Sequence, residues 1–327
     1  MTQSLFNYQT VQYLIIDDEY QNQRIDNFLF SRLKKIPKAM LYKLIRKGEI
    51  RVNKKRVKPE YKLQKNDMLR VAPIRLDNMP IINKPDIEKT THQYQWIENA
   101  IIYEDKHLIV VNKPANIAVH GGSGISLGII EILRIVRQKE KFLELVHRID
   151  KSTSGLLLIA KKRAVLIHIQ AQFKHKSIKK SYLTLVEGQW DKKIKKVNQP
   201  LLKYASQLNE KKVKVHSEGK TASTYFTVVD VYDGASLLIA QPITGRTHQI
   251  RVHALHENHA ILGDNKYGSK EQLLFCKKIG LQRLFLHAEK LTLQHPISEK
   301  NMTFEASLPS ELKKTLIKLK KISSTDQ

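Results

Sequence analysis

Two apolar, strand-like runs separated by a short polar insert, within residues 143–162, constrain the fold of this chain more than any other segment. The insert is rich in serine, threonine and glycine, so a strand–loop–strand unit is predicted. Asp150 is the only carboxylate between the two runs and is flanked by Arg148 and Lys151. A lone acid in a basic loop is a candidate catalytic group, but the same pattern fits a turn aspartate that caps backbone amides.

The charge of the chain favours a nucleic acid partner. There are 57 Lys and Arg residues against 31 Asp and Glu among 327 residues, a formal net charge of +26. The commonest use of such an excess is to replace the condensed counterions of a nucleic acid backbone. Membrane binding competes with this interpretation, but no run approaches the roughly 18 apolar residues that a membrane span needs. Composition therefore predicts nucleic acid binding and no membrane association.

Cysteine and histidine usage gives no sign of a cofactor. The single cysteine, Cys276, excludes an intramolecular disulfide and a cysteine metal cluster. No two of the 13 histidines have the His-x-x-x-His spacing of many zinc enzymes, and the glycines at 121–124 lack the spacing of a nucleotide-binding loop. We expect no metal and no nucleotide cofactor. The N-terminal residues lack the pattern of an export signal, so a cytoplasmic protein is expected. We also expect the protein to act as a monomer.

The N-terminal residues predict a small basic module after a short strand at 11–16. Apolar residues at helical spacing predict one helix from Ile25 to Leu33 and another that ends at Gly48. A hairpin around residues 53–55 follows. Twelve Lys and Arg residues against one acid between positions 31 and 58 predict contact with RNA or DNA. The candidates for this contact are Arg46, Lys47, Arg51, Lys54, Lys55 and Arg56.

The remaining chain predicts a linker and a larger domain. We expect an N-terminal strand and RNA-binding module at 1–74, a linker at 75–97 where hydrophobic periodicity lapses, and a catalytic domain at 98–327. Helices are predicted at 126–137, at 163–173 and from 308 onward, and strands at 101–103, 108–111, 180–186, 221–231, 236–240, 284–288, 291–293 and 302–305. Short strands mixed with separated helices predict an α+β domain on a mixed, mostly antiparallel sheet.

Three further side chains are open to more than one interpretation from spacing alone. Residues 245–253 predict a helix that Thr247 could cap, with side chains 248 and 251 on one face. Arg251 on such a helix is ordinarily a surface residue, and Tyr182 on a strand is ordinarily a core aromatic. Cys276 lacks the glycine-rich or helix-start context of a reactive thiol.

Four blocks, in this order, resemble the RluA-type family of pseudouridine synthases. They are His147–Asp150 with Thr153–Leu156, Lys180–Tyr182, Gly245–His253 and Arg283–Ala288. The segments Arg24–Asp26 and Lys47–Asn53 resemble an S4 RNA-binding domain, and Val52–Leu63 and Ala118–Gly124 resemble the bacterial large-subunit synthase C subfamily (RluC). Each block alone is weak evidence, whereas the ordered combination is specific. Ile149 stands where the family usually has leucine, a conservative exchange.

The resemblance implies a pseudouridine-synthase core with a small α/β S4 domain, and it implies roles by position. Asp150 matches the catalytic aspartate, Tyr182 the tyrosine that stacks on the target base, and Arg251 the arginine that pairs with the aspartate. Arg148, with His147 beside it, matches the RNA-contacting position that fills the space of the flipped nucleotide.

The resemblance also implies a reaction and a substrate. The reaction is isomerisation of several separate uridines in 23S rRNA, free or in a large-subunit assembly intermediate, and it needs no cofactor. Three alternatives remain open: a synthase of the same fold that acts on other rRNA or tRNA uridines, a uridine glycosylase, and a noncatalytic S4-containing ribosome-assembly protein.

Overall fold

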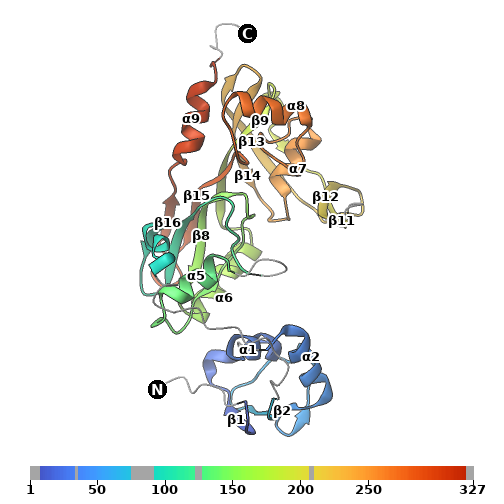
Figure 1. The fold of residues 1–327 in the computed structure, drawn as a ribbon, viewed down its shortest axis with the longest axis vertical. Helices are drawn as coiled ribbons and strands as arrows, with labels where there is room; N and C mark the ends of the chain where they lie inside the picture. The colour runs from blue at the N-terminus through green and yellow to red at the C-terminus, as the bar shows by residue number, and fades with distance from the viewer. Residues whose placement is uncertain (1–7, 34–35, 75–91, 122–126, 206–209, 322–327) are drawn as a thin grey trace. The chain divides into compact units, whose positions relative to one another are not determined.

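The chain forms two compact units, residues 1–84 and residues 85–327, each described here by itself (Figure 1). The computed structural model describes residues 8–33, 36–74, 92–121, 127–205 and 210–321. Most of the predicted linker, residues 75–91, lies outside the described residues. Its last part packs into the second unit, where Ile97 of helix α4 (Trp96–Asn99) is fully buried.

The first unit packs helices α1 and α2 on a four-stranded antiparallel sheet. Strand order is β1-β4-β2-β3. Its elements are β1 (Gln12–Ile15), a 3-10 turn (Asp18–Tyr20), α1 (Ile25–Arg32), α2 (Lys38–Lys47), β2 (Ile50–Val52), β3 (Lys55–Arg56) and β4 (Met68–Val71). The two predicted helices and the predicted hairpin are confirmed. Helix α2 ends at Gly48, whose φ of +76° turns the chain into β2.

The second unit is built on a ten-stranded mixed sheet. Its main path is β10-β13-β14-β9-β15-β8-β6-β5, with β16 beside β15 and β7 beside β8. The strands are β5 (Ile101–Glu104), β6 (Leu108–Lys113), β7 (Glu144–Leu145), β8 (Ser154–Ala160), β9 (Lys179–Glu187), β10 (Lys196–Val197), β13 (Thr224–Tyr232), β14 (Ala235–Pro242), β15 (Leu286–Gln294) and β16 (Asn301–Glu305). Every described pair is antiparallel except β8 with β15. The predicted α+β class is therefore confirmed.

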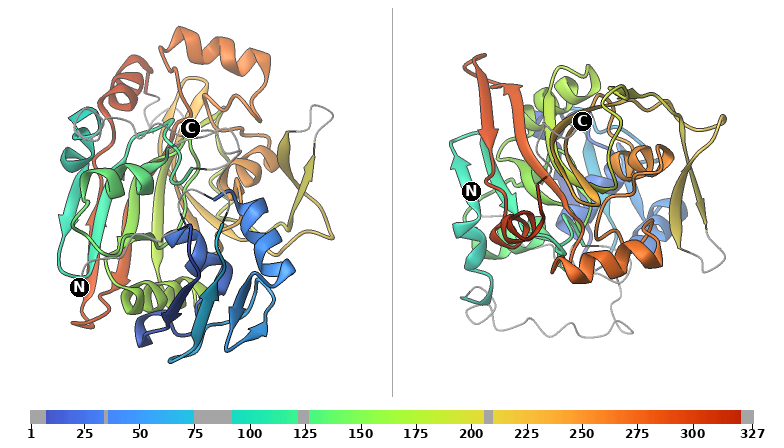
Figure 2. Two further views of the ribbon diagram at one scale, coloured as in Figure 1. Left: turned by 60° about the horizontal axis from the view of Figure 1, so that its bottom comes forward. Right: turned by 90° about the horizontal axis from the view of Figure 1, so that it is seen from above.

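Helices cover both faces of this sheet. They are α5 (Ile129–Val136), α6 (Arg163–Lys174), α7 (Gln249–His256), α8 (Lys270–Lys278) and α9 (Ser310–Lys318). Alternate residues of β8 face α5 on one side and α6 on the other, so the strand is buried along its whole length and apolar from Leu156 to Ala160. At the other end, α7 covers one face of β13 and β14, and α8 and α9 cover the opposite face. Figure 2 shows the twist of the sheet from two directions.

Several features of the second unit differ from the prediction, including the following three. The strands expected at 284–288 and 291–293 form one continuous strand, β15, with an irregularity beside β9. A hairpin of β11 (Leu201–Ala205) and β12 (Lys211–Val215), which extends from the sheet in Figure 1, was not anticipated. The prediction that Thr247 caps α7 is wrong, because the N-cap is His248 in the left-handed conformation, with φ of +53°.

Candidate active site

A buried polar network holds the end of the loop that carries Asp150, at the point where strand β8 begins. Ser154 and Gly155, the first residues of β8, pair in parallel with His287 and Ala288 of β15. Arg283 Nη2 donates to Ser154 Oγ at 2.7 Å, and Ser154 Oγ lies 2.9 Å from His287 Nδ1. His287 Nε2 lies 3.0 Å from the carbonyl oxygen of Ala306, so it carries the proton and Nδ1 accepts from the serine hydroxyl. The network therefore fixes the end of the loop to the middle of the sheet.

Gly155 permits the close approach of the two parallel strands. Its φ is +108°, and a Cβ atom at this position would lie 2.2 Å from the carbonyl oxygen of Ala288. A side chain here would separate β8 from β15. The glycine is therefore needed both for its backbone conformation and for the space it leaves.

A buried lysine, Lys113, ties the residue after Asp150 to the end of β6. Its Nζ donates to the carbonyl oxygens of Pro114, Ile117 and Lys151 at 2.7, 2.9 and 3.1 Å. Burial, aided by the charge of Arg283, lowers the pKa of this ammonium group to about 7, although the charge of Asp150 opposes the shift. Three carbonyl acceptors favour the protonated form, since a neutral amine has only two N–H donors. Sequence reasoning missed this residue, and its signal was a lysine at the end of the apolar strand.

Asp150 is partly exposed and faces two side chains from α7 and its N-cap. Oδ2 of Asp150 lies 3.4 Å from Nη1 of Arg251 and 3.9 Å from Nε2 of His248. The carboxylate side chain is 30% exposed, whereas that of Arg251 is 7% exposed. The arrangement places one accessible anion against one buried cation. The pairing of Asp150 with Arg251 was predicted, and the presence of His248 was not.

Arg251 is locked from behind by Asp264. Its Nε and Nη2 donate to the two carboxylate oxygens of Asp264, both at 2.7 Å, and the Asp264 side chain is 1% exposed. The same carboxylate accepts the backbone amides of Lys266 and Tyr267. Burial by itself lowers the pKa of Arg251, but the bonds to Asp264 reverse this effect and raise it. Such a bidentate pair fixes the guanidinium plane and leaves Nη1 directed at Asp150.

Tyr182 lies on β9, in register with Ala240 of β14 and Ala288 of β15. Its ring packs against three clusters of apolar side chains at the middle of the sheet. Burial, followed by the negative charge of Asp150, raises the pKa of its phenol above the ordinary value. The hydroxyl group therefore stays protonated at neutral pH.

The two residues before Ile149 in the loop lie in different surroundings. Arg148 is exposed. His147 stacks on Phe173 of α6, with ring centroids 5.0 Å apart, and its Nε2 accepts the Leu158 amide at 3.1 Å. Burial and the nearby charge of Lys180 lower the pKa of His147 to about 3, so its ring is neutral. Its described contacts attach the loop to β8, whereas Arg148 is available to a ligand.

The predicted RNA-binding residues of the first unit gather at the end of α2 and on the β2–β3 hairpin. Arg46 and Lys47 occupy the last turn of α2 and are exposed. Lys54, Lys55 and Arg56 are exposed on the hairpin. Arg51, in contrast, is half-buried and donates through Nε to the carbonyl oxygen of Gly48. Five of the six candidates thus present their charge to solvent.

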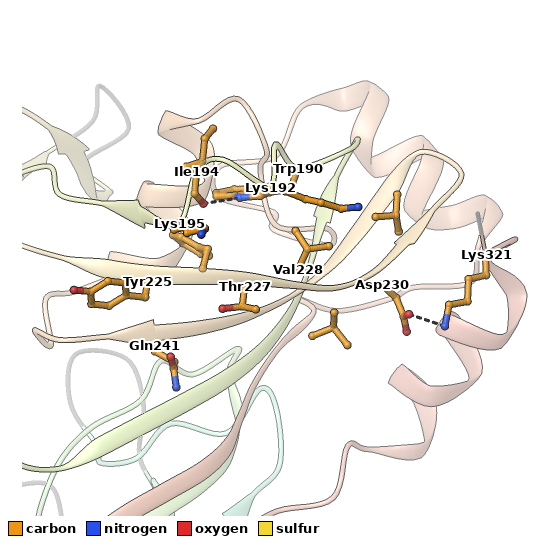
Figure 3. Close-up of a pocket in the computed structure, with 13 residues that line it drawn as sticks. Trp190, Lys192, Ile194, Lys195, Tyr225, Thr227, Val228, Asp230, Gln241 and Lys321 are labelled. Carbon is orange, nitrogen blue, oxygen red and sulfur yellow. Dashed lines mark hydrogen bonds and ion pairs between the residues drawn. The ribbon is translucent and has the colours of Figure 1, made fainter. Parts of the chain in front are cut away.

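The described residues outside this cluster add no further part to the site. Within the described ranges there is no group of three or more His, Cys, Asp and Glu side chains that could hold a metal. No helix in the described part of the chain is long and apolar enough to cross a membrane. A groove of about 950 Å³ lies along β13, between Trp190, Tyr225 and the ion pair of Asp230 with Lys321 (Figure 3). None of its lining residues belongs to the cluster around Asp150.

The fold and the site together define a pseudouridine synthase: a twisted mixed sheet presents one accessible carboxylate against a locked arginine, and a partly buried tyrosine lies on a central strand of the same sheet. Comparison with known proteins agrees. Residues 107–256 match the family described as RNA pseudouridylate synthase, and residues 23–69 match the S4 domain. The chain belongs to the RNA pseudouridylate synthase family and carries an N-terminal S4 domain, which confirms the predicted class of enzyme.

Relatives match this chain over nearly its whole length. It is 47% identical to ribosomal large subunit pseudouridine synthase C of Vibrio parahaemolyticus, over 95% of this chain and 97% of the relative. It is 46% identical to the protein of the same name in Escherichia coli strain K12, again over 95% and 97%. Among solved structures, human RNA pseudouridylate synthase domain containing 4 is similar, with a TM-score of 0.58 and 26% identity over 71% of this chain and 97% of that one.

Proposed function

We propose that this protein converts specific uridines of bacterial 23S rRNA into pseudouridine, with Asp150 as the catalytic carboxylate. One observation carries the proposal: Asp150 is partly exposed and faces Arg251, which Asp264 holds in place. The near full-length similarity to ribosomal large subunit pseudouridine synthase C proteins supports the choice of substrate.

The reaction rearranges bonds without consuming water or electrons. The bond from N1 to C1′ of the uridine breaks, the base turns, and a new bond joins C5 to C1′. The proton on C5 is released, and N1 gains a proton. No redox partner is required, so the groups that matter are a carboxylate, an aromatic surface and an environment that excludes water.

Asp150 acts in its ionised form. As the glycosidic bond breaks, positive character grows on the sugar, and a carboxylate there can stabilise this charge, attack C1′ or remove the 2′ proton. Arg251 favours the anion at 3.4 Å, and its own bidentate bond to Asp264 prevents it from moving onto Asp150. The carboxylate thereby faces a fixed cation without being fully neutralised.

The target uridine reaches this carboxylate by leaving its stack. Extruding a base costs a few kcal/mol, which inserted side chains and a stacking platform can offset. The exposed Arg148, two residues from Asp150, fills the space of the flipped nucleotide, and the ring of Tyr182 supports the base.

The first unit brings RNA to the enzyme. Its exposed basic residues at the end of α2 and on the β2–β3 hairpin bind the phosphate backbone of the rRNA, and this binding weakens with salt. The enzyme acts as a monomer in the cytoplasm, on free 23S rRNA or on a large-subunit assembly intermediate.

The Asp150→Asn variant tests the proposal. It keeps the size of the side chain and removes the charge, so binding of 23S rRNA stays within about tenfold, roughly 1.4 kcal/mol, while isomerisation stops. Release of tritium from RNA labelled at C5 of uridine measures the reaction. Asp233→Asn, the same change on an exposed turn, is the matched control and keeps native activity. Substantial tritium release by Asp150→Asn would contradict the assignment.

The substrate is tested separately in cells. A strain that lacks the gene loses pseudouridine at its target sites, and sequencing of these sites identifies the RNA. Loss confined to tRNA would retain the chemistry and change the substrate. Free uracil among the products would instead indicate a glycosylase.

A further inference from the structure

We infer that His248 is a positioning residue for Asp150: its neutral imidazole, oriented by the hydroxyl group of Tyr267, presents an N–H group to the same carboxylate oxygen that faces Arg251. The inference rests on the proposed role of Asp150. From the sequence, His248 was predicted only to share one face of a helix with Arg251. The inference gives this histidine a function.

The contacts of Tyr267 determine which nitrogen of His248 carries the proton. The backbone amide of Val213 on β12 donates to the Tyr267 hydroxyl oxygen at 3.0 Å. The same hydroxyl group lies 2.8 Å from Nδ1 of His248. Burial raises the pKa of Tyr267 to about 12, so the phenol keeps its proton at neutral pH. The Tyr267 hydroxyl group therefore donates a hydrogen bond to Nδ1 of His248, and the ring proton of His248 is on Nε2.

The imidazole is also uncharged. Burial lowers the pKa of His248 to about 4, and the charges of Arg251 and Lys266 act in the same direction, while those of Asp150 and Asp264 oppose it. His248 thus offers Asp150 a hydrogen-bond donor without a second positive charge. A second cation would pair more tightly with the carboxylate and lower its reactivity.

Both donors approach the same oxygen of Asp150. Arg251 Nη1 lies 3.4 Å and His248 Nε2 lies 3.9 Å from Oδ2. Among the described residues, none has a hydrogen bond to Oδ1. Two donors on one oxygen fix the plane of the carboxylate and leave the other oxygen directed at the substrate. The distance of 3.9 Å is long for a hydrogen bond, and we expect it to shorten in the complex with substrate.

The backbone places His248 for this task. It is the N-cap of α7 in the left-handed conformation, which is uncommon for a residue with a side chain. Tyr267, whose ring lies 5.0 Å below the Arg251 guanidinium group, holds both neighbours of Asp150 at once. Strain kept at such a position is typical of a functional site.

Single-turnover kinetics test the inference. On 23S rRNA labelled with tritium at C5 of uridine, His248→Leu lowers the rate of tritium release by ten- to a hundredfold, about 1.4–2.7 kcal/mol, with the Kd for RNA changed less than threefold. His248→Gln, whose amide N–H replaces the Nε2 donor, returns the rate to within about fivefold of native. His256→Leu, an exposed histidine on the same helix, is the matched control and has no effect.

The outcomes separate this inference from the proposed function. A native rate in His248→Leu, or equal losses in the Leu and Gln variants, would overturn the positioning role while Asp150→Asn remained inactive. An active Asp150→Asn would overturn the proposed function itself. A role in folding alone would lower the unfolding temperature of both His248 variants without the difference in rate between them.

A spectroscopic measurement needs no activity. In the native protein with nitrogen-15 histidine, the signals absent from His248→Gln are those of His248. At pH 7 they show a neutral ring with the proton on Nε2, and Tyr267→Phe shifts them toward a mixture of the two neutral forms. A proton on Nδ1, or a charged ring, in the native protein would overturn the inference.

Discussion

The buried pair of Arg251 and Asp264 gives the sharpest test of the site, through the Asp264→Asn variant. Two N–H groups of Arg251 donate to Asp264 at 2.7 Å, and among the residues that the structure describes the only other carboxylate paired with the guanidinium group is Asp150, at 3.4 Å. Removal of one partner from a buried ion pair costs about 3–5 kcal/mol. Asparagine retains one acceptor oxygen, so the lower end, about 3 kcal/mol, is expected. For a unit of this size that loss lowers the unfolding temperature by roughly 6–12 °C.

The same variant changes the chemistry in a defined direction. Without the charge of Asp264, Arg251 moves toward Asp150 and neutralises it more fully, so the single-turnover rate falls by at least about tenfold. Denaturant unfolding and tritium release measure the two effects on one preparation. Glu305→Gln, which removes an exposed partner of Lys290 at 2.6 Å, is the matched control and leaves both unchanged. Native stability and a native rate in Asp264→Asn would refute the locking role.

Two further predictions concern the loop that carries Asp150. Gly155→Ala places a Cβ atom 2.2 Å from the Ala288 carbonyl oxygen at φ +108°, so a loss of more than about 1 kcal/mol is expected in denaturant unfolding. Gly245→Ala, with no atom within 4 Å of its Cβ, is the near-neutral control. His147 has a folded-state pKa of about 3 against 6.5 when unfolded, so the unfolded chain binds its proton first and stability falls as pH drops from 6.5 toward 3. His147→Phe removes this contribution, which is about 1.4 kcal/mol per pH unit. The free energy of unfolding, measured in urea at pH 7, 6 and 5, then falls less steeply with pH than in the native protein. An unchanged slope would mean that His147 takes up a proton in the folded protein.

Local pattern was enough to predict the parts of the fold that local physics determines. Helix α2 and its Gly48 cap follow from helical spacing and a left-handed glycine, and the hairpin after it follows from two short strands around a polar turn. The β11–β12 hairpin was missed although Lys212–Val215 alternates with the period of a strand. The alternation covers only four residues, at the lower limit for this signal.

For the candidate site, in contrast, local sequence pattern was not enough. Asp150, Tyr182 and Arg251 were identified through motif resemblance, whereas Lys113 and Asp264 were not identified at all. The contacts that join these two residues to the site are distant in sequence: Lys113 bonds to Lys151, 38 positions away, and Asp264 to Arg251, 13 positions away. Pairings of this kind depend on how the strands and helices pack, which spacing alone does not determine.

The cluster around Asp150 is held from three independent directions. Lys113 bonds to the peptide that follows it, Ser154 anchors the start of β8 to β15, and Asp264 locks Arg251 beside it. Each anchor is buried, so the energy that orients the carboxylate is supplied by folding and not by binding RNA. Loss of an anchor should therefore slow isomerisation more than it weakens RNA binding, because the exposed basic residues proposed to bind RNA are contacted by none of these anchors. A base that has left its stack then meets a carboxylate already in position, and the binding energy of the rRNA remains available for extruding the base.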